Sequence, residues 1–162
     1  MEIIPNWHPL FVHFTIALLL TAVLLFVIGK VAPSSASWRA ACVSAARWDL
    51  CLGTLITVGT VIAGWYAYNT VHHDEAAHIA MTDHRNWALI TALVFVVLAL
   101  WSVISRKREP ALIFVLCMIV AAGLLAATGY KGGELVYRHG LGVMALPEPG
   151  EHHHHGGHED RD

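Results

Sequence analysis

The chain has few charged residues and few cysteines, and each scarcity excludes a class of protein. Only 14% of its 162 residues are charged and the formal net charge is −2, so no nucleic-acid partner is expected. The three cysteines, Cys42, Cys51 and Cys117, form no motif with each other and indicate no disulfide framework. The sequence also lacks a nucleotide-binding loop, a nucleophile elbow and a zinc-protease motif.

Hydrophobic residues make up 56% of the chain, and four long apolar stretches contain most of them. These stretches run over residues 10–28, 50–71, 87–104 and 111–129. A helix of about 20 residues crosses the roughly 30 Å hydrocarbon core of a bilayer, and each stretch is close to that length. The first has no basic segment before it and no small-residue cleavage site after it, so we expect a retained helix. The sequence therefore predicts an all-α fold, a bundle of four transmembrane helices.

Basic residues predict the orientation of this bundle. Six of the ten Lys and Arg residues lie in two connecting segments, namely Lys30, Arg39 and Arg47 in one and residues 106–108 in the other. By the positive-inside rule these short segments are cytoplasmic, which places both termini outside. Ten of the twelve acidic residues then also lie outside. We therefore expect a multi-pass protein of a bacterial inner membrane with both termini in the periplasm.

Local signals predict where the helices begin and end. Pro9 suits a first helical turn, and Ser37 and Thr82 could cap the second and third helices. The pair Gly132-Gly133 is expected to begin an irregular stretch after the fourth helix. A Pro-Glu-Pro segment divides the chain into a membrane domain over residues 1–146 and a disordered, histidine-rich tail over residues 147–162. No internal repeat is evident in the sequence.

All twelve histidines fall on the predicted outer side of the membrane, and this sidedness is the strongest functional signal. They are His8, His13, His72, His73, His78, His84, His139, His152, His153, His154, His155 and His158. Imidazole is the commonest protein ligand for transition metals and for haem iron. A shared metal or haem site near one membrane surface is therefore expected, in preference to histidines that only satisfy helix ends.

His13 is the first candidate for a haem ligand, because an ionisable residue within an apolar helix is costly unless it has a partner. His84 and His139 lie near the outer ends of the third and fourth helices, and either could provide the opposite ligand. His8 stands at the start of the first helix and belongs to the same layer.

Two further features bear on haem. Gly53, Thr57, Thr60, Gly64 and Ala67 form a stripe of small residues along one face of the second helix. Such a stripe lets another helix approach closely in lipid, and a flat porphyrin against it is the alternative. Cationic side chains near the outer surface could pair with haem propionates or with lipid phosphates; they are Arg85, Lys131 and Arg138.

Another group of side chains could bind Zn, Cu or Ni without haem. His78, Met81 and His84 would share a face if their segment is helical, and His72 and His73 precede them. The run from His152 to His155, with His158 after it, is low-complexity sequence of a metal-binding kind.

Two segments resemble the motifs of a known family. They are His8-Pro9-Leu10-Phe11-Val12-His13-Phe14 and the stretch GGELVYRHG at residues 132–140. Over residues 5–145 the chain resembles a bacterial family of four-helix inner-membrane proteins that is named for a domain of unknown function. The resemblance implies the same topology, implies His8, His13 and His139 as motif residues, and implies no reaction. The family pattern has proline after His-Phe where this chain has Thr15, which removes the basis for a kink there.

Three interpretations follow. The first is a membrane protein with haem b near the outer face, ligated by two imidazoles of a four-helix bundle and acting in electron transfer. It requires the lipid bilayer and a periplasmic or membrane redox partner, and it is compatible with a homo-oligomer. The second is non-redox binding or sensing of Zn, Cu or Ni, and the third is a structural subunit of a membrane complex.

Overall fold

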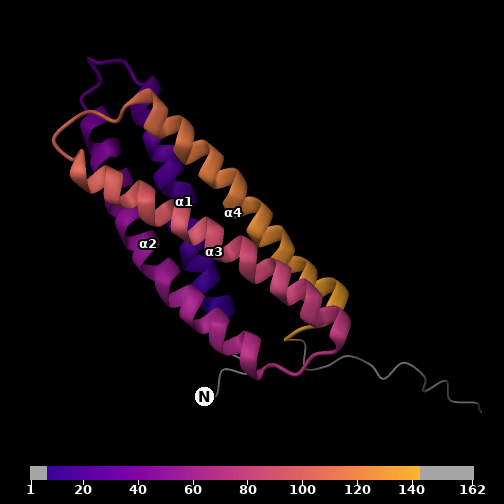
Figure 1. The fold of residues 1–162 in the computed structure, drawn as a ribbon. Coiled ribbons are helices and arrows are strands. Elements are labelled where there is room, and N and C mark those ends of the chain that lie inside the picture. Colours follow the sequence, from indigo (N-terminus) through magenta and orange to yellow (C-terminus); the bar gives the residue numbers. More distant parts are fainter. Residues whose placement is uncertain (1–6, 143–162) are drawn as a thin grey trace, which may run out of the picture.

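A computed structural model describes residues 7–142, which contain four α-helices and no strand. Helix α1 spans His8–Val31, α2 spans Arg39–Thr70, α3 spans Glu75–Ile104 and α4 spans Leu112–His139. Figure 1 shows an elongated bundle, with the α1–α2 and α3–α4 connections at one end and the α2–α3 link at the other. The predicted all-α fold of four helices is confirmed. The predicted tail at residues 147–162 lies outside the described residues.

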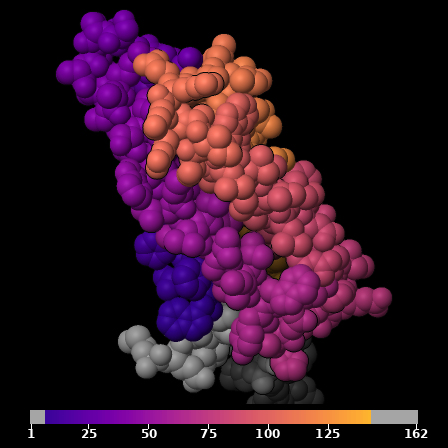
Figure 2. Space-filling model, turned by 60° about the vertical axis from the view of Figure 1, so that its left-hand side comes forward, coloured from indigo at the N-terminus to yellow at the C-terminus, as the bar shows by residue number. Residues whose placement is uncertain are grey.

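The surface of the bundle is apolar, as expected for helices in lipid. All four helices are long and apolar enough to cross a membrane. Large side chains such as Leu55, Ile62 and Leu93 are more than 60% exposed. A lipid environment removes the cost of exposing them, while each helix satisfies its own backbone hydrogen bonds. Figure 2 shows one face of the bundle, formed mainly by α2 and α3. The chain is a multi-pass membrane protein.

Each helix packs against two of the others, so the bundle has a square cross-section. The contacting pairs are α1 with α2, α2 with α3, α3 with α4, and α4 with α1. Helices α1 and α3 are therefore diagonally opposed and run in the same direction. The largest fully buried side chains of the bundle are Leu19, Phe26, Leu50, Phe95 and Met118. The core is thus a narrow column shared by all four helices.

The two helical hairpins, α1–α2 and α3–α4, bury equivalent positions. In α1 the buried residues include Thr15, Leu19, Ala22, Val23 and Phe26. Each has a buried counterpart 76 positions later in α3, namely Thr91, Phe95, Leu98, Ala99 and Ser102. The same holds between α2 and α4 at an offset of 68. There Ala46, Leu50, Gly53, Thr57 and Thr60 correspond to Phe114, Met118, Ala121, Leu125 and Thr128.

This correspondence corrects the expectation that the chain has no internal repeat. The two hairpins share the spacing of their inward-facing positions, whereas most of the side chains at those positions differ. Because α1 and α3 run in the same direction, the hairpins are related by an approximate two-fold axis along the bundle, as in parallel repeats of other membrane proteins. Residues near that axis come in pairs, one from each hairpin.

Helix α3 begins earlier than the sequence predicts. Asp74 is its N-cap, and the Asp74 side chain accepts a hydrogen bond from the backbone N–H of Ala77 at 2.8 Å. Thr82 is therefore not a cap but lies inside the helix, where its hydroxyl is bonded to the Tyr68 hydroxyl. An aspartate-capped amphipathic turn thus extends α3 beyond its apolar stretch.

Helix α4 ends later than the sequence predicts, and Gly132-Gly133 lies within it. Its end is set by Gly140, which has a φ of 61° in the left-handed region that favours glycine. Gly140 donates its N–H to the carbonyl of Val136 at 3.1 Å, which closes the helix in an αL cap. The expectation of an irregular stretch at residue 132 is therefore wrong.

Helix α2 begins at Arg39 after Trp38, and Ser37 does not cap it. Its stripe of small residues has the predicted helix-packing role. A Cβ atom at Gly53 would lie 2.8 Å from a methyl carbon of Leu19, so glycine there permits close approach of α1. Pro9 occupies the first turn of α1, as predicted.

Candidate functional site

His8 is the first residue of α1 and faces α2 inside the bundle. Its ring is half-buried, and its Nδ1 lies 3.0 Å from the carbonyl oxygen of Thr60. A carbonyl can only accept, so Nδ1 carries the proton and donates it. Gly64 lies one turn further along α2, where a Cβ would stand 2.9 Å from Cε1 and Nδ1 of the ring. Glycine at this position therefore makes room for the imidazole.

His84 lies on α3 and repeats this arrangement against α4. A Cβ at Gly132 would lie 3.1 Å from Cε1 of the His84 ring. The Nδ1 of His84 is buried and makes no hydrogen bond, while the backbone of Thr128 lies beside the ring. A small adjustment would give His84 the bond to Thr128 that His8 makes to Thr60. Buried polar atoms in proteins are normally hydrogen-bonded, so this unpaired nitrogen of His84 is an exception that needs an explanation.

The two imidazoles meet across the diagonal of the bundle. Their centroids are 6.3 Å apart and their planes are at 77° to each other. His84 is the α3 counterpart of His8, and Gly132 is the α4 counterpart of Gly64, with the offsets of 76 and 68 found for the core. The internal repeat therefore places two equivalent histidines beside the two-fold axis. We call His8, His84, Gly64 and Gly132 the histidine pair site.

Two hydrogen-bonded threonine pairs lie one layer further into the bundle. The hydroxyls of Thr15 and Thr60 are 2.7 Å apart, and those of Thr91 and Thr128 are 2.8 Å apart. Both bonds join the two helices of one hairpin, and all four side chains are buried. Thr15 thus has a hydrogen-bond partner on α2. These pairs fix each histidine-bearing helix against its neighbour.

His13 and His139 occupy other positions. His13 is exposed, and its Nδ1 lies 2.5 Å from the carbonyl oxygen of Pro9 in the same helix. Five residues of α-helix turn it about 140° away from His8. His139 is the last residue of α4 and half-buried. The structure therefore pairs His84 with His8, and a ligand role for His13 or His139 stays a prediction.

The histidines of the α2–α3 link form a separate exposed group. His73 and His78 stack with their centroids 5.1 Å apart, and Nε2 of His73 lies 2.9 Å from Nδ1 of His78. His78 also bonds to the hydroxyl of Tyr68 at 3.2 Å. Met81 is buried and His72 is exposed. Within residues 7–142, no three His, Cys, Asp or Glu side chains are arranged to hold a metal ion together. The tail histidines from His152 to His158 lie outside the described residues.

The cations predicted near this end are distributed around the pair site. The guanidinium of Arg85 lies over the rings of Tyr68 and Trp65, 4.8 Å and 5.9 Å from their centroids. Lys131 forms an ion pair with Asp83, directly before His84. Arg138 pairs with Glu134 one turn back on α4, at 2.5 Å. Arg85 and Lys131 are thus adjacent in sequence to the site residues, whereas Arg138 is about two turns from Gly132.

The pairing of His8 with His84 was not predicted from the sequence. A signal for it is present, because each hairpin contains His-x6-Thr on its first helix and Thr-x3-Gly on its second. The residues are His8, Thr15, Thr60 and Gly64 in one hairpin and His84, Thr91, Thr128 and Gly132 in the other.

Comparison with known proteins identifies one family. A family model described as "Predicted membrane protein (DUF2231)" matches residues 5–145 of the chain. No curated protein and no solved structure matches it.

Proposed function

The chain belongs to the DUF2231 family of predicted membrane proteins, whose description names no activity, so we propose a function from the histidine pair site. We propose that the bundle binds haem b through His8 and His84 and acts as an electron carrier. The observation that supports this proposal is the meeting of these two imidazoles across the bundle, 6.3 Å between centroids. They are related by the internal repeat, and histidine imidazole is a common protein ligand of haem iron.

The donor set fits haem. His8 donates its Nδ1 proton to the Thr60 carbonyl, so the lone pair of the neutral ring is on Nε2, the nitrogen through which this ring would bind a metal. A hydrogen bond from the second ring nitrogen to a backbone carbonyl is the usual support of a histidine ligand. The backbone of Thr128 lies beside His84 and would support that ring by the same kind of hydrogen bond. Gly64 and Gly132 leave no Cβ beside either ring.

The number of ligands favours haem over a bare metal ion. A structural zinc site uses four protein ligands and a catalytic one uses three. In the described part of the chain, His, Cys, Asp and Glu nowhere gather in threes with metal-binding geometry. Two imidazoles suffice for haem, since the porphyrin supplies the remaining nitrogens.

Bound at this site, haem would supply a one-electron redox centre. His8 and His84 would both hold the iron, and a haem held by two protein side chains would favour electron transfer over catalysis at the iron. Arg85, whose guanidinium lies over Tyr68, and Lys131, which pairs with Asp83, would be the cations that meet anionic propionates at this end of the bundle. By the positive-inside rule this end faces the periplasm, so the redox partner would be a periplasmic or membrane protein.

The test is an absorption spectrum of the purified full-length protein, expressed with a haem supply and solubilised in detergent. We expect a Soret band, with α and β bands on reduction, and one haem per chain by extraction. A colourless protein that also fails to take up added haem would contradict the proposal. Stoichiometric zinc, copper or nickel in such a colourless protein would favour the metal-binding interpretation instead.

A further inference from the structure

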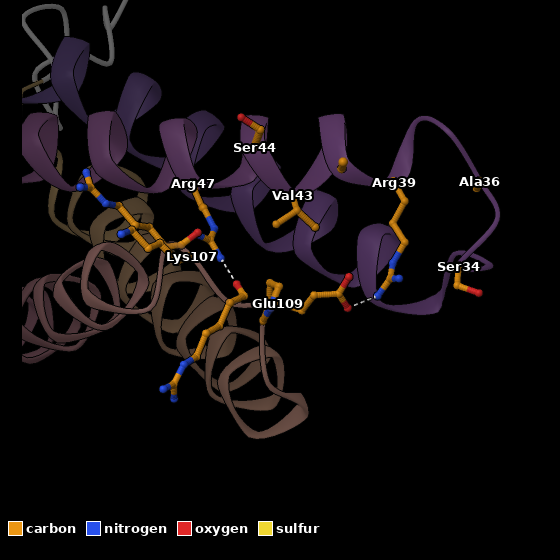
Figure 3. Close-up of a pocket in the computed structure, with 12 residues that line it drawn as sticks. Ser34, Ala36, Arg39, Val43, Ser44, Arg47, Lys107 and Glu109 are labelled. Carbon is orange, nitrogen blue, oxygen red and sulfur yellow. Dashed lines mark hydrogen bonds and ion pairs between the residues drawn. The ribbon is translucent and has the colours of Figure 1, made fainter.

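The opposite end of the bundle contains a pocket that the proposed function does not use. It has a volume of about 430 Å³ and lies between the start of α2 and the segment that leads into α4. Figure 3 shows Arg39 and Arg47 reaching into it from α2, with Lys107 and Glu109 on the facing segment. Arg106 and Arg108 complete its charged lining. We call this the basic pocket.

Cations in the basic pocket exceed anions by a wide margin. Five cationic residues line it, namely Arg39, Arg47, Arg106, Lys107 and Arg108, against the single carboxylate of Glu109. That carboxylate is already used, because Nη2 of Arg39 lies 2.6 Å from Glu109 Oε2. Like charges held this close together repel unless an anion lies among them.

Only part of this charge has a structural role. Nε of Arg39 donates to the carbonyl of Gly29 at 2.9 Å, and Arg47 donates to the carbonyls of Arg106 and Arg108. These bonds fasten the segment before α4 to α2. Nε of Arg47 is nevertheless buried without a hydrogen-bond partner. A guanidinium N–H can only donate, so this buried group lacks the acceptor that it would normally have.

The remaining cations make no bonds that would explain them. The side chains of Arg106, Lys107 and Arg108 are exposed and form no ion pair with any residue between 7 and 142. Ser34 and Ser44 add hydroxyl donors to the same pocket. Guanidinium, ammonium and hydroxyl groups around one cavity are the set that recognises phosphate oxygens.

From these observations we propose that the basic pocket binds a phosphate-bearing anion, for which a phospholipid headgroup is the source that the location favours. The pocket lies at the end of the bundle where α1 and α3 end and α4 begins, and the terminal residues of these helices are strongly exposed and apolar: Val31 at 76%, Ile104 at 84% and Leu112 at 59%. An acyl chain could lie along these residues while its phosphate enters the pocket. Basic pockets between transmembrane helices on the cytoplasmic side recognise anionic headgroups in this way.

The experiment measures lipid binding to the detergent-purified full chain by native mass spectrometry. Phosphatidylglycerol and phosphatidylcholine with identical acyl chains are compared, and inorganic phosphate is added in a parallel arm. The test variant is R106Q/K107Q/R108Q, which removes three cations that hold no structural bond. The control is R85Q/K131Q/R138Q, which removes three cations at the histidine end.

We expect phosphatidylglycerol to bind the unmodified chain in preference to phosphatidylcholine. The pocket variant should lose at least about tenfold in that affinity, on the order expected for several surface cations, while the control variant keeps it. If inorganic phosphate competes at millimolar concentration, the site is a phosphate site whose ligand is soluble, and the proposal holds in that form. Absence of headgroup selectivity, or equal losses in both triple variants, would overturn it.

Folding of the pocket variant is checked by circular dichroism. Should it fail to fold, the single variants R106Q and K107Q replace it, and each must weaken binding of phosphatidylglycerol for the proposal to stand. This site is independent of haem, so its test succeeds or fails whatever the outcome at the histidine pair site.

Discussion

The imidazoles of His8 and His84 lie edge to face, 6.3 Å between centroids, although they belong to the diagonally opposed helices α1 and α3. Each ring rests against a glycine of the neighbouring antiparallel helix. The polar rings therefore bridge the centre of a bundle whose next layers are threonine pairs and then apolar side chains. That arrangement leads to predictions about cofactor content, packing, stability and topology.

Replacement of His8 or His84 by alanine should each remove haem from the purified protein. In the proposed site both rings are needed as ligands, so each variant should lose haem. The measurement is haem per folded chain, with circular dichroism to confirm folding. His13→Ala is the matched control, since His13 is exposed and bonded within its own helix. If His13→Ala loses haem while His8→Ala keeps it, the ligand is the one that the sequence analysis favoured.

Gly132→Ala should disturb the pair site, and Gly133→Ala should not. A Cβ at residue 132 meets the His84 ring at 3.1 Å, whereas a Cβ at residue 133 meets nothing within 4 Å. We expect Gly132→Ala to reduce haem occupancy several-fold. Gly133→Ala should leave occupancy unchanged and stabilise α4 by up to about 1 kcal/mol through helix propensity. Equal occupancy in the two variants would mean that the ring adjusts freely.

Loss of one threonine hydroxyl should weaken a hairpin modestly. Hydrogen bonds between transmembrane helices contribute on the order of 0.5–2 kcal/mol. Thr15→Val should therefore lower the free energy of unfolding in mixed micelles by about that amount, and so should Thr91→Val in the other hairpin. A double-mutant cycle of Thr15→Val with Thr60→Val tests the bond itself. Strict additivity would show that the 2.7 Å contact contributes nothing.

Cysteine labelling should place the two ends of the bundle on opposite sides of the membrane. Ala76, near the start of α3, and Ser35, between α1 and α2, are both exposed. In a background without Cys42, Cys51 and Cys117, A76C should react with an impermeant reagent in intact cells and S35C should not. The reverse pattern would put the histidines in the cytoplasm.

Deletion of residues 150–162 should leave the helical content unchanged and reduce the number of weakly bound metal ions. Four consecutive histidines, His152 to His155, are removed with that segment. Circular dichroism and equilibrium dialysis with nickel measure the two effects. A deleted protein that no longer folds would show that the segment is an integral part of the domain.

Much of the fold could be predicted from hydropathy, because apolar length alone determines how many helices cross a bilayer. Helix ends could not be placed as well. In lipid a helix continues wherever its backbone would otherwise lose hydrogen bonds, so Gly132 and Gly133 do not end α4. Likewise, Asp74 caps α3 in a polar segment that hydropathy does not register as helical.

The sequence predicts that imidazoles gather at one end of the bundle, but it does not predict which of them meet. Sidedness indicated imidazoles at one surface, yet it gave no means to choose among seven histidines outside the tail. The choice depends on which way each side chain points around its helix. His8 is aligned with buried Thr15 and Leu19, two and three turns on, whereas His13 lies on the lipid-facing side. The same alignment, compared between hairpins, would have revealed the repeat.

The repeat also shows where the two halves have diverged. By the offsets of 76 and 68, the positions of Asp83 and Lys131 correspond to Trp7 and Ala63. One imidazole therefore stands next to an ion pair, while its twin stands next to an indole and a methyl group. In a homodimer of one hairpin the two imidazoles would have identical surroundings. In this single chain, whose two hairpins differ, their surroundings are unlike. The proposed electron carrier would therefore have two chemically different sides, one formed by each hairpin.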